Sequence, residues 1–124
     1  MKVLNFEDSV YKANAIRKVL NQCGVAKIEL VSNVEDGLQM LKNAEDAGAP
    51  FDLIITDMHY PMKQGAISDT EAGEKLVQLL QEQGKQTKVI VCSSRNMKLP
   101  GVYGCIWYSE ISDWEEELCD LVRE

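Results

Sequence analysis

Short apolar runs alternate along the chain with longer segments in which apolar residues recur every three or four positions. Runs of four to eight residues rich in Val, Ile, Leu or Phe predict β-strands. Four such runs cover Val3–Phe6, Lys27–Val31, Phe51–Thr56 and Lys88–Cys92, and a weaker fifth covers Cys105–Tyr108. The third run is almost continuously apolar, which is typical of a central strand covered on both faces.

The segments between these runs have the spacing of amphipathic helices. Their apolar positions are Val10, Ala13, Ile16, Leu20 and Cys23; Val34, Leu38 and Leu41; Ala72, Leu76, Leu79 and Leu80; and Trp114, Leu118 and Leu121. We expect Gly24, Gly48 and Gly84 to end the first three helices, and a capping box, Ser68-x-x-Glu71, to begin the third. Between Arg95 and Tyr103, Pro100-Gly101 predicts a stunted helix or a loop.

Strands that alternate with helices in this order predict a parallel sheet with helices on both faces, because parallel strands are joined by right-handed crossovers. We therefore expect a doubly wound α/β sandwich. The 124 residues are near the commonest domain size, and 45% of them are hydrophobic. No linker, repeat or low-complexity stretch interrupts the pattern, so residues 1–124 are expected to form one domain.

Charge and cysteine usage narrow the classes of function. Twenty acidic residues against 13 basic ones give a formal net charge of −7, which argues against direct binding of nucleic acid. The four cysteines have no C-x-x-C spacing and there is one His, so neither a zinc site nor a disulfide framework is expected. With no signal peptide and no apolar run of the ~20 residues that a membrane span needs, we expect a soluble cytoplasmic protein.

Polar residues that follow three of the strands are the candidate chemistry. Glu7 and Asp8 follow the first strand, Asp57 the third, and Ser93 lies at the end of the fourth. Sites in open α/β sheets form at the carboxyl ends of strands. If the first and third strands are neighbours, three carboxylates converge, and Mg²⁺ is the cation that suits them. Asp57 could then attack phosphorus as a nucleophile while the Ser93 hydroxyl donates to a phosphoryl oxygen.

Three segments of the sequence resemble the receiver domains of bacterial response regulators. They are Val3-Leu4-Asn5-Phe6-Glu7-Asp8, Asp52-Leu53-Ile54-Ile55-Thr56-Asp57-Met58-His59-Tyr60-Pro61-Met62 and Val89-Ile90-Val91-Cys92-Ser93-Ser94. The D-x-x-x-P-M run that follows the third strand is the most specific of them, and the acidic pair is the next. The resemblance runs the length of the chain.

The resemblance to this CheY-like family implies a flavodoxin-like sheet of order 2-1-3-4-5, Mg²⁺ as cofactor, and a sensor histidine kinase or phosphotransfer protein as phosphoryl donor. It implies that Glu7 and Asp8 bind the metal, that Asp57 accepts the phosphoryl group and that the backbone carbonyl of His59 contributes to metal binding. Ser93 is similar to the family's switch hydroxyl and Tyr108 to its rotating aromatic. The output would pass to a downstream partner protein, with no enzymatic activity beyond the domain's own phosphorylation and dephosphorylation.

One departure from the family pattern concerns a lysine that ordinarily ends the fifth strand and pairs with the acceptor carboxylate. The corresponding position here is Ile111, or Ser109 or Glu110 in other registers, and no lysine follows Lys98. We expect Arg95 or Lys98 to supply a substitute cation, with Arg95 favoured because its planar guanidinium can bind phosphate oxygens bidentately.

Two local departures concern the connections. The connection from Met58 to Thr70 exceeds the ~4–6 residues of a median loop and is expected to cover the site. An altered fourth helix implies a partner surface unlike that of ordinary receivers.

Three classes of function remain open at this point. The first is a receiver of a two-component phosphorelay without its own output domain. The second is an interaction module that keeps the receiver fold and works without phosphorylation, which the missing lysine favours. The third is an enzyme, either a phosphohydrolase with an Asp nucleophile or a flavin protein. The first strand lacks the D-x-D of such hydrolases, and Ser9-Val10-Tyr11-Lys12 stands where a flavin protein would have its phosphate loop.

Overall fold

A central parallel sheet forms the core of the computed structural model, which describes all residues from Met1 to Glu124. Its strands are β1 (Lys2–Phe6), β2 (Lys27–Val31), β3 (Leu53–Thr56), β6 (Lys88–Ser93) and β7 (Gly104–Trp107), in the spatial order β2-β1-β3-β6-β7. This is the flavodoxin-like order 2-1-3-4-5 expected above, and all four strand pairs are parallel. The strand ends differ from the predicted ones by at most two residues.

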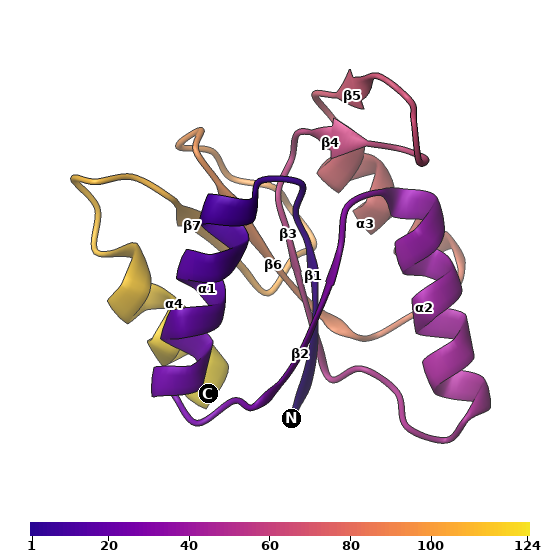
Figure 1. The fold of residues 1–124 in the computed structure, drawn as a ribbon, viewed down its shortest axis with the longest axis horizontal. Coiled ribbons are helices and arrows are strands. Elements are labelled where there is room, and N and C mark those ends of the chain that lie inside the picture. Colours follow the sequence, from indigo (N-terminus) through magenta and orange to yellow (C-terminus); the bar gives the residue numbers. More distant parts are fainter.

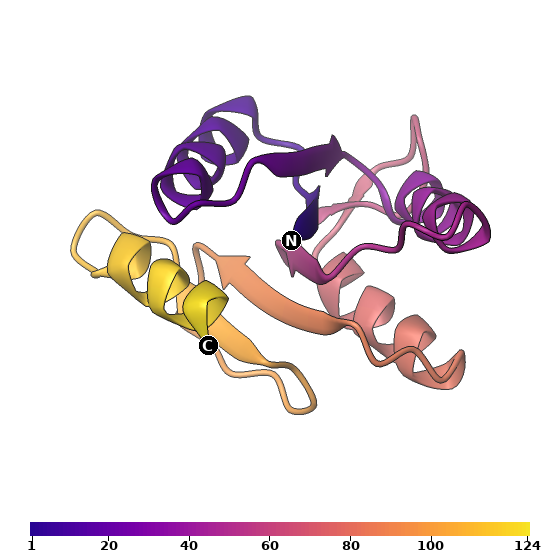
Figure 2. The same cartoon turned by 90° about the horizontal axis from the view of Figure 1, so that it is seen from below.

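Helices cover both faces of the sheet, as the three-layer prediction requires. The helices α1 (Val10–Gln22) and α4 (Trp114–Arg123) lie on one face, and α2 (Val34–Asp46) and α3 (Ala72–Glu82) lie on the other (Figures 1 and 2). Gly24, Gly48 and Gly84 follow the first three helices in chain order with φ of 91°, 72° and 69°, which confirms the expected stops. None of the helices combines the length and apolar character needed to cross a lipid bilayer.

Alternation along the strands divides the core into two clusters. On β3, Ile54 faces the cluster beneath α2 and α3, whereas Leu53 and Ile55 face the cluster beneath α1 and α4. β3 pairs with β1 on one edge and with β6 on the other, and all of its residues are buried. The continuous apolar run in the sequence is therefore explained by a central strand with packed helices on both sides.

The connection after β3 is an ordered excursion and not a plain loop. Two short strands, β4 (Tyr60–Pro61) and β5 (Ser68–Asp69), pair antiparallel in a small lobe beyond the main sheet (Figure 1). The predicted capping box is wrong, because Ser68 belongs to β5 and Glu71 precedes α3 without a side-chain cap. Asp69 Oδ1 instead accepts a hydrogen bond from the Glu71 amide at 2.8 Å.

No helix forms between β6 and β7, where the sequence predicted a stunted helix or a loop, and a loop spans residues 94–103. Leu99 and Val102 pack this loop against the α2–α3 side of the core. The Trp107 indole donates a hydrogen bond to the Ser94 carbonyl at 3.0 Å. The loop is therefore held at its start and along its length without helical hydrogen bonds.

The cysteines include one pair that the sequence did not predict. Cys23 and Cys119 form a disulfide with a Cα–Cα distance of 5.7 Å, while Cys92 and Cys105 are free. The expectation of no disulfide is wrong because the 96-residue separation of these two cysteines says nothing about proximity. Packing of α1 against α4 brings them together.

Candidate functional site

Asp57 lies directly after β3, at the carboxyl edge of the sheet. Its amide donates to the Phe6 carbonyl at 3.1 Å, which extends the pairing of β1 with β3 by one residue. The Thr56 hydroxyl, 2.8 Å from the Tyr60 hydroxyl, donates to the Asp57 carbonyl at 2.7 Å. Gly73 at the start of α3 packs so closely that a Cβ there would overlap the same carbonyl oxygen. The Asp57 backbone is therefore fixed from three sides.

The two carboxylate oxygens of Asp57 have different surroundings. Oδ1 accepts a hydrogen bond from the Met58 amide at 2.7 Å and lies 3.2 Å from the Lys12 ammonium. Oδ2 makes no hydrogen bond or ion pair, and 15% of the side chain is exposed. One oxygen is thus held by the protein while the other is available to an incoming group.

Glu7 is the buried member of the acidic pair that follows β1. Its Oε2 accepts a hydrogen bond from the Ser9 amide at 3.1 Å, and its Oε1 lies 3.0 Å from the Lys12 ammonium. Burial raises the pKa of Glu7 above its ordinary value, Lys12 opposes that rise, and Asp57 adds to it. Asp8, the second member of the pair, is exposed.

Lys12 is a functional candidate that the sequence prediction missed. Its ammonium contacts the Cys92 carbonyl at 2.6 Å, Glu7 at 3.0 Å and Asp57 at 3.2 Å, and its side chain is 8% exposed. Burial lowers its pKa, but the attraction of Asp57 and then of Glu7 is stronger in sum, so the pKa of Lys12 lies above its ordinary value. The ammonium is therefore firmly charged inside the site.

The periodicity of α1 contained a signal for this lysine. The predicted apolar face began at Val10, but Val10 is 68% exposed, and the buried face is made by Lys12, Ala13, Ile16, Val19 and Leu20. Lys12 stands four residues before Ile16, on the inward stripe. A lysine on the core side of a helix, in the first turn after an acidic pair, needs a buried anionic partner.

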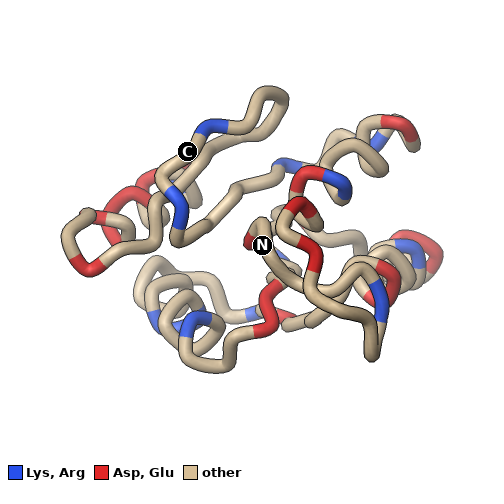
Figure 3. Tube along the Cα trace, turned by 90° about the horizontal axis from the view of Figure 1, so that it is seen from above, with Lys and Arg blue, Asp and Glu red and all other residues tan.

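Glu7, Asp8 and Asp57 are placed as the ligands of a divalent metal ion would be. Glu7, Asp8 and Asp57 each offer a carboxylate oxygen, and these atoms lie within 4.8 Å of one another. Glu7 Oε1 is buried, and its one polar contact is the Lys12 ammonium at 3.0 Å, so it retains a lone pair for a cation. Oxygen ligands at a partly exposed sheet edge suit Mg²⁺, which keeps several waters. Figure 3 looks onto this end of the molecule, with the acidic and basic positions coloured along the Cα trace. Bound there, Mg²⁺ would neutralise part of the carboxylate charge.

Ser93 and Tyr108 lie on the side of the site formed by β6 and β7. Ser93 is buried, and its hydroxyl oxygen accepts a hydrogen bond from the Arg95 amide at 3.1 Å. The Tyr108 amide donates to the Ser93 carbonyl at 2.7 Å. The Tyr108 ring packs on Trp114 at 4.8 Å between centroids and lies 5.3 Å from the Lys12 ammonium. Tyr108 thus connects the lysine to the end of β7.

The substitute cations expected from the sequence, Arg95 and Lys98, form no ion pair with the acidic residues in this structure. The Arg95 guanidinium donates to the Thr70 carbonyl at 3.2 Å instead. Ile111, the position of the missing lysine, is 84% exposed. The His59 side chain is also exposed and makes no hydrogen bond or ion pair with the acidic residues. A metal contact through its carbonyl stays a prediction.

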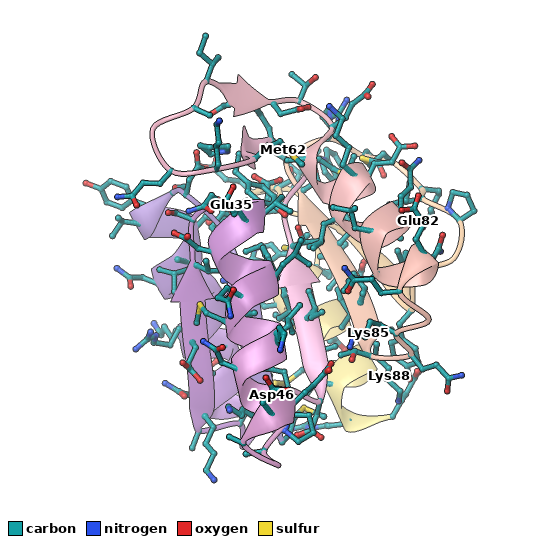
Figure 4. All side chains as sticks on the ribbon, turned by 90° about the vertical axis from the view of Figure 1, so that its right-hand side faces the viewer. Glu35, Asp46, Met62, Glu82, Lys85 and Lys88 are labelled. Carbon is teal, nitrogen blue, oxygen red and sulfur yellow. A yellow bond between two sulfur atoms is a disulfide. The ribbon has the colours of Figure 1, made fainter.

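A second hollow lies on the α2–α3 side, away from the acidic residues. It is a groove of about 810 Å³ with Leu38, Leu41 and Leu80 among its lining residues. Figure 4 looks onto this face, where Lys85 extends from the end of α3 toward α2. The Lys85 ammonium forms a 2.6 Å ion pair with Glu45. Neither Glu7, Asp8 nor Asp57 lines the groove, so its surface is separate from the candidate site.

Comparison with known proteins matches the fold and no sequence family. No protein-family model and no curated protein matches the sequence. Among solved structures, the signal receiver domain of a putative Luxo repressor protein from Vibrio parahaemolyticus superposes with a TM-score of 0.73. It is 18% identical over 98% of this chain and 86% of that one.

Two further solved structures are similar over nearly the full length. The chemotaxis response regulator CheY4 of Vibrio cholerae is 23% identical, with a TM-score of 0.67 over 98% of this chain and 96% of that one. The N-terminal domain of a response regulator/sensory box/GGDEF 3-domain protein from Carboxydothermus hydrogenoformans is 21% identical. Its TM-score is 0.69 over 99% of this chain and 91% of that one. The chain therefore has the receiver-domain fold of response regulators, with the order β2-β1-β3-β6-β7 and an acidic cluster at its carboxyl edge.

Proposed function

We propose that this chain is a receiver that accepts a phosphoryl group on Asp57 from a histidine kinase or phosphotransfer protein and signals through a partner protein. The observation that carries the proposal is the asymmetric Asp57 carboxylate. Oδ1 is held by the Met58 amide and Lys12, whereas Oδ2 has no partner and belongs to a side chain that is partly exposed. A rigidly oriented carboxylate with one free oxygen is what in-line attack on phosphorus requires.

The groups around Asp57 support the same chemistry. Glu7, Asp8 and Asp57, with the His59 carbonyl, are the proposed Mg²⁺ ligands. Ser93, buried at the end of β6, is the proposed hydroxyl donor to a phosphoryl oxygen, since the neighbouring strand β3 ends one residue before Asp57. Tyr108, bonded to the Ser93 backbone, is the proposed element that carries a change at Ser93 to the surface of β7 and α4.

A second candidate is an interaction module that works without phosphorylation. Two observations favour it: Ile111 is exposed where a lysine is usual, and a loop over residues 94–103 replaces the helix between β6 and β7. Both candidates share the fold, and they differ in whether Asp57 reacts. A covalent test therefore separates them.

The experiment is intact-mass spectrometry after incubation with Mg²⁺ and acetyl phosphate. Wild type should gain the mass of one phosphoryl group, and Asp57→Asn should gain none. Asp120→Asn, which changes an exposed carboxylate on α4, is the matched control and should behave as wild type. An adduct that persists in Asp57→Asn would place the acceptor elsewhere, and a wild type that stays unmodified would favour the interaction module.

A further inference from the structure

We infer that Lys12, on the first turn of α1, is the cation that offsets the charge of the transferred phosphoryl group in this site. The inference rests on the phosphoryl-acceptor function proposed above. It assigns to a residue of α1 the pairing of a cation with the Asp57 carboxylate, which no residue at the end of β7 provides. The cation predicted from the sequence, Arg95, is bound to the Thr70 carbonyl instead.

The geometry of the Lys12 ammonium is that of a fixed internal charge. An ammonium has three N–H donors, and three oxygens lie within 3.2 Å of this one, from Cys92, Glu7 and Asp57. These partners come from β6, from the residue after β1 and from the residue after β3. The Ser9 side chain caps α1 and accepts from the Lys12 amide, so the helix start and the ammonium are positioned together.

No other cation reaches the acceptor. Lys12 is the one basic side chain within 4.0 Å of the Asp57 carboxylate. The ammonium also lies 5.3 Å from the centroid of the Tyr108 ring. It therefore reaches Asp57 from α1 while lying near the first residue after β7.

The charge balance of the reaction gives this ammonium a role. The Asp57 Oδ2–phosphorus bond forms while the bond between phosphorus and the donor's leaving group breaks. That leaving group is the imidazole nitrogen of a phosphohistidine, or acetate when acetyl phosphate is the donor, and it departs with the electron pair of the broken bond. A singly charged carboxylate becomes an acyl phosphate whose phosphoryl group carries about two negative charges at neutral pH. The negative charge at Asp57 therefore rises, and an ammonium already 3.2 Å from this carboxylate offsets the increase without moving a new group in.

Lys12 should act in opposite directions on the two ligands of the site. Its positive charge attracts phosphoryl oxygens, but it repels a divalent cation bound by Glu7, Asp8 and Asp57. Replacing a residue that merely supports the fold would instead weaken the binding of both ligands. The sign of the two changes therefore separates a charge-balancing role from a structural one.

The test compares wild type with Lys12→Met and Lys12→Gln. The glutamine keeps a donor for the Cys92 carbonyl and removes the charge. Lys18→Met, an exposed lysine on the same helix, is the matched control, and thermal unfolding reports on folding. Mg²⁺ affinity is measured by NMR titration, and the affinity for beryllofluoride, a phosphoryl mimic, is measured at saturating Mg²⁺.

We expect both Lys12 variants to bind Mg²⁺ roughly five- to tenfold more tightly and beryllofluoride roughly ten- to a hundredfold more weakly, with Lys18→Met unchanged. Beryllofluoride binding equal to wild type, or a parallel loss of both ligands, would overturn the assignment of Lys12. A variant too unstable to fold in the absence of ligand would also overturn it, since that result makes Lys12 a structural residue. If wild type itself binds no beryllofluoride and takes no phosphoryl group, the proposed function fails and not Lys12 alone.

Discussion

At the scale of single residues, the site depends on close contacts made by small or buried groups. Gly73 is the second residue of α3, where its amide donates to the Met58 carbonyl at 3.2 Å. A methyl group at this position would overlap the Asp57 carbonyl oxygen and approach Met58 Cα at 3.1 Å. Because both neighbours are backbone atoms, neither can rotate away. Gly73 therefore sets how closely α3 approaches Asp57.

We predict that Gly73→Ala lowers the free energy of unfolding by about 2 kcal/mol or more, as overpacking against backbone does. Helix propensity alone would change it by ~1 kcal/mol in the stabilising direction, so the sign of the result identifies the cause. Urea unfolding of the variant measures it, with Gln78→Ala, at an exposed α3 position, as the control. A variant as stable as wild type would mean that α3 can shift away from Asp57 at little cost.

At the scale of secondary-structure elements, the two faces of the sheet are secured differently. On one face, α1 and α4 contact each other and are joined by the Cys23–Cys119 disulfide. On the other face, α2 and α3 are separated by the open groove, and the Lys85–Glu45 ion pair extends between them. An exposed ion pair of this kind contributes little stability. The α1–α4 face, which carries Lys12 and contacts Tyr108, is therefore held more firmly than the α2–α3 face.

We predict that the double variant Cys23→Ser, Cys119→Ser loses about 2–4 kcal/mol of unfolding free energy, because a disulfide that closes a long loop restricts the unfolded chain. Urea unfolding without reductant should show the loss, and reduced wild type should match the variant. Cys105→Ser is the control. Equal stability of oxidised and reduced wild type would contradict the prediction.

Alkylation of the folded protein provides a separate check on the cysteines. Burial raises the pKa of the Cys92 thiol to about 12, so Cys92 should react slowly at neutral pH. The half-buried Cys105 should be labelled first, and Cys23 and Cys119 should react only after reduction. Four thiols reactive at one rate in unreduced protein would exclude the disulfide.

At the scale of the whole molecule, the excess of negative charge causes the strongest repulsion where carboxylates cluster. The formal net charge is −7, and Glu7, Asp8 and Asp57 converge at one edge of the sheet against a single ammonium. Unfolding separates these residues and removes both the repulsion and any metal site. Stability should therefore depend on divalent cations more than on ionic strength.

We predict that Mg²⁺ at ten times its dissociation constant stabilises the native protein by about 1.4 kcal/mol, because it binds the folded and not the unfolded chain. The melting temperature should rise with Mg²⁺ and stay lower in NaCl of matched ionic strength. Asp8→Asn should reduce the rise, since it removes one of the three carboxylates. Identical curves in the two salts would argue against a metal site.

The sequence alone determined the order of elements, the parallel sheet and the strand ends to within two residues, because periods of 2 and 3.6 and the glycine stops are local properties. It also placed Glu7, Asp8 and Asp57 at strand ends, and adjacency of β1 and β3 brings them together. Only the tertiary structure decided which cation meets Asp57, since that depends on how α1 rotates to bury Lys12 and expose Val10. The same holds for the disulfide, because Cys23 and Cys119 are distant in sequence and adjacent only after α1 packs on α4.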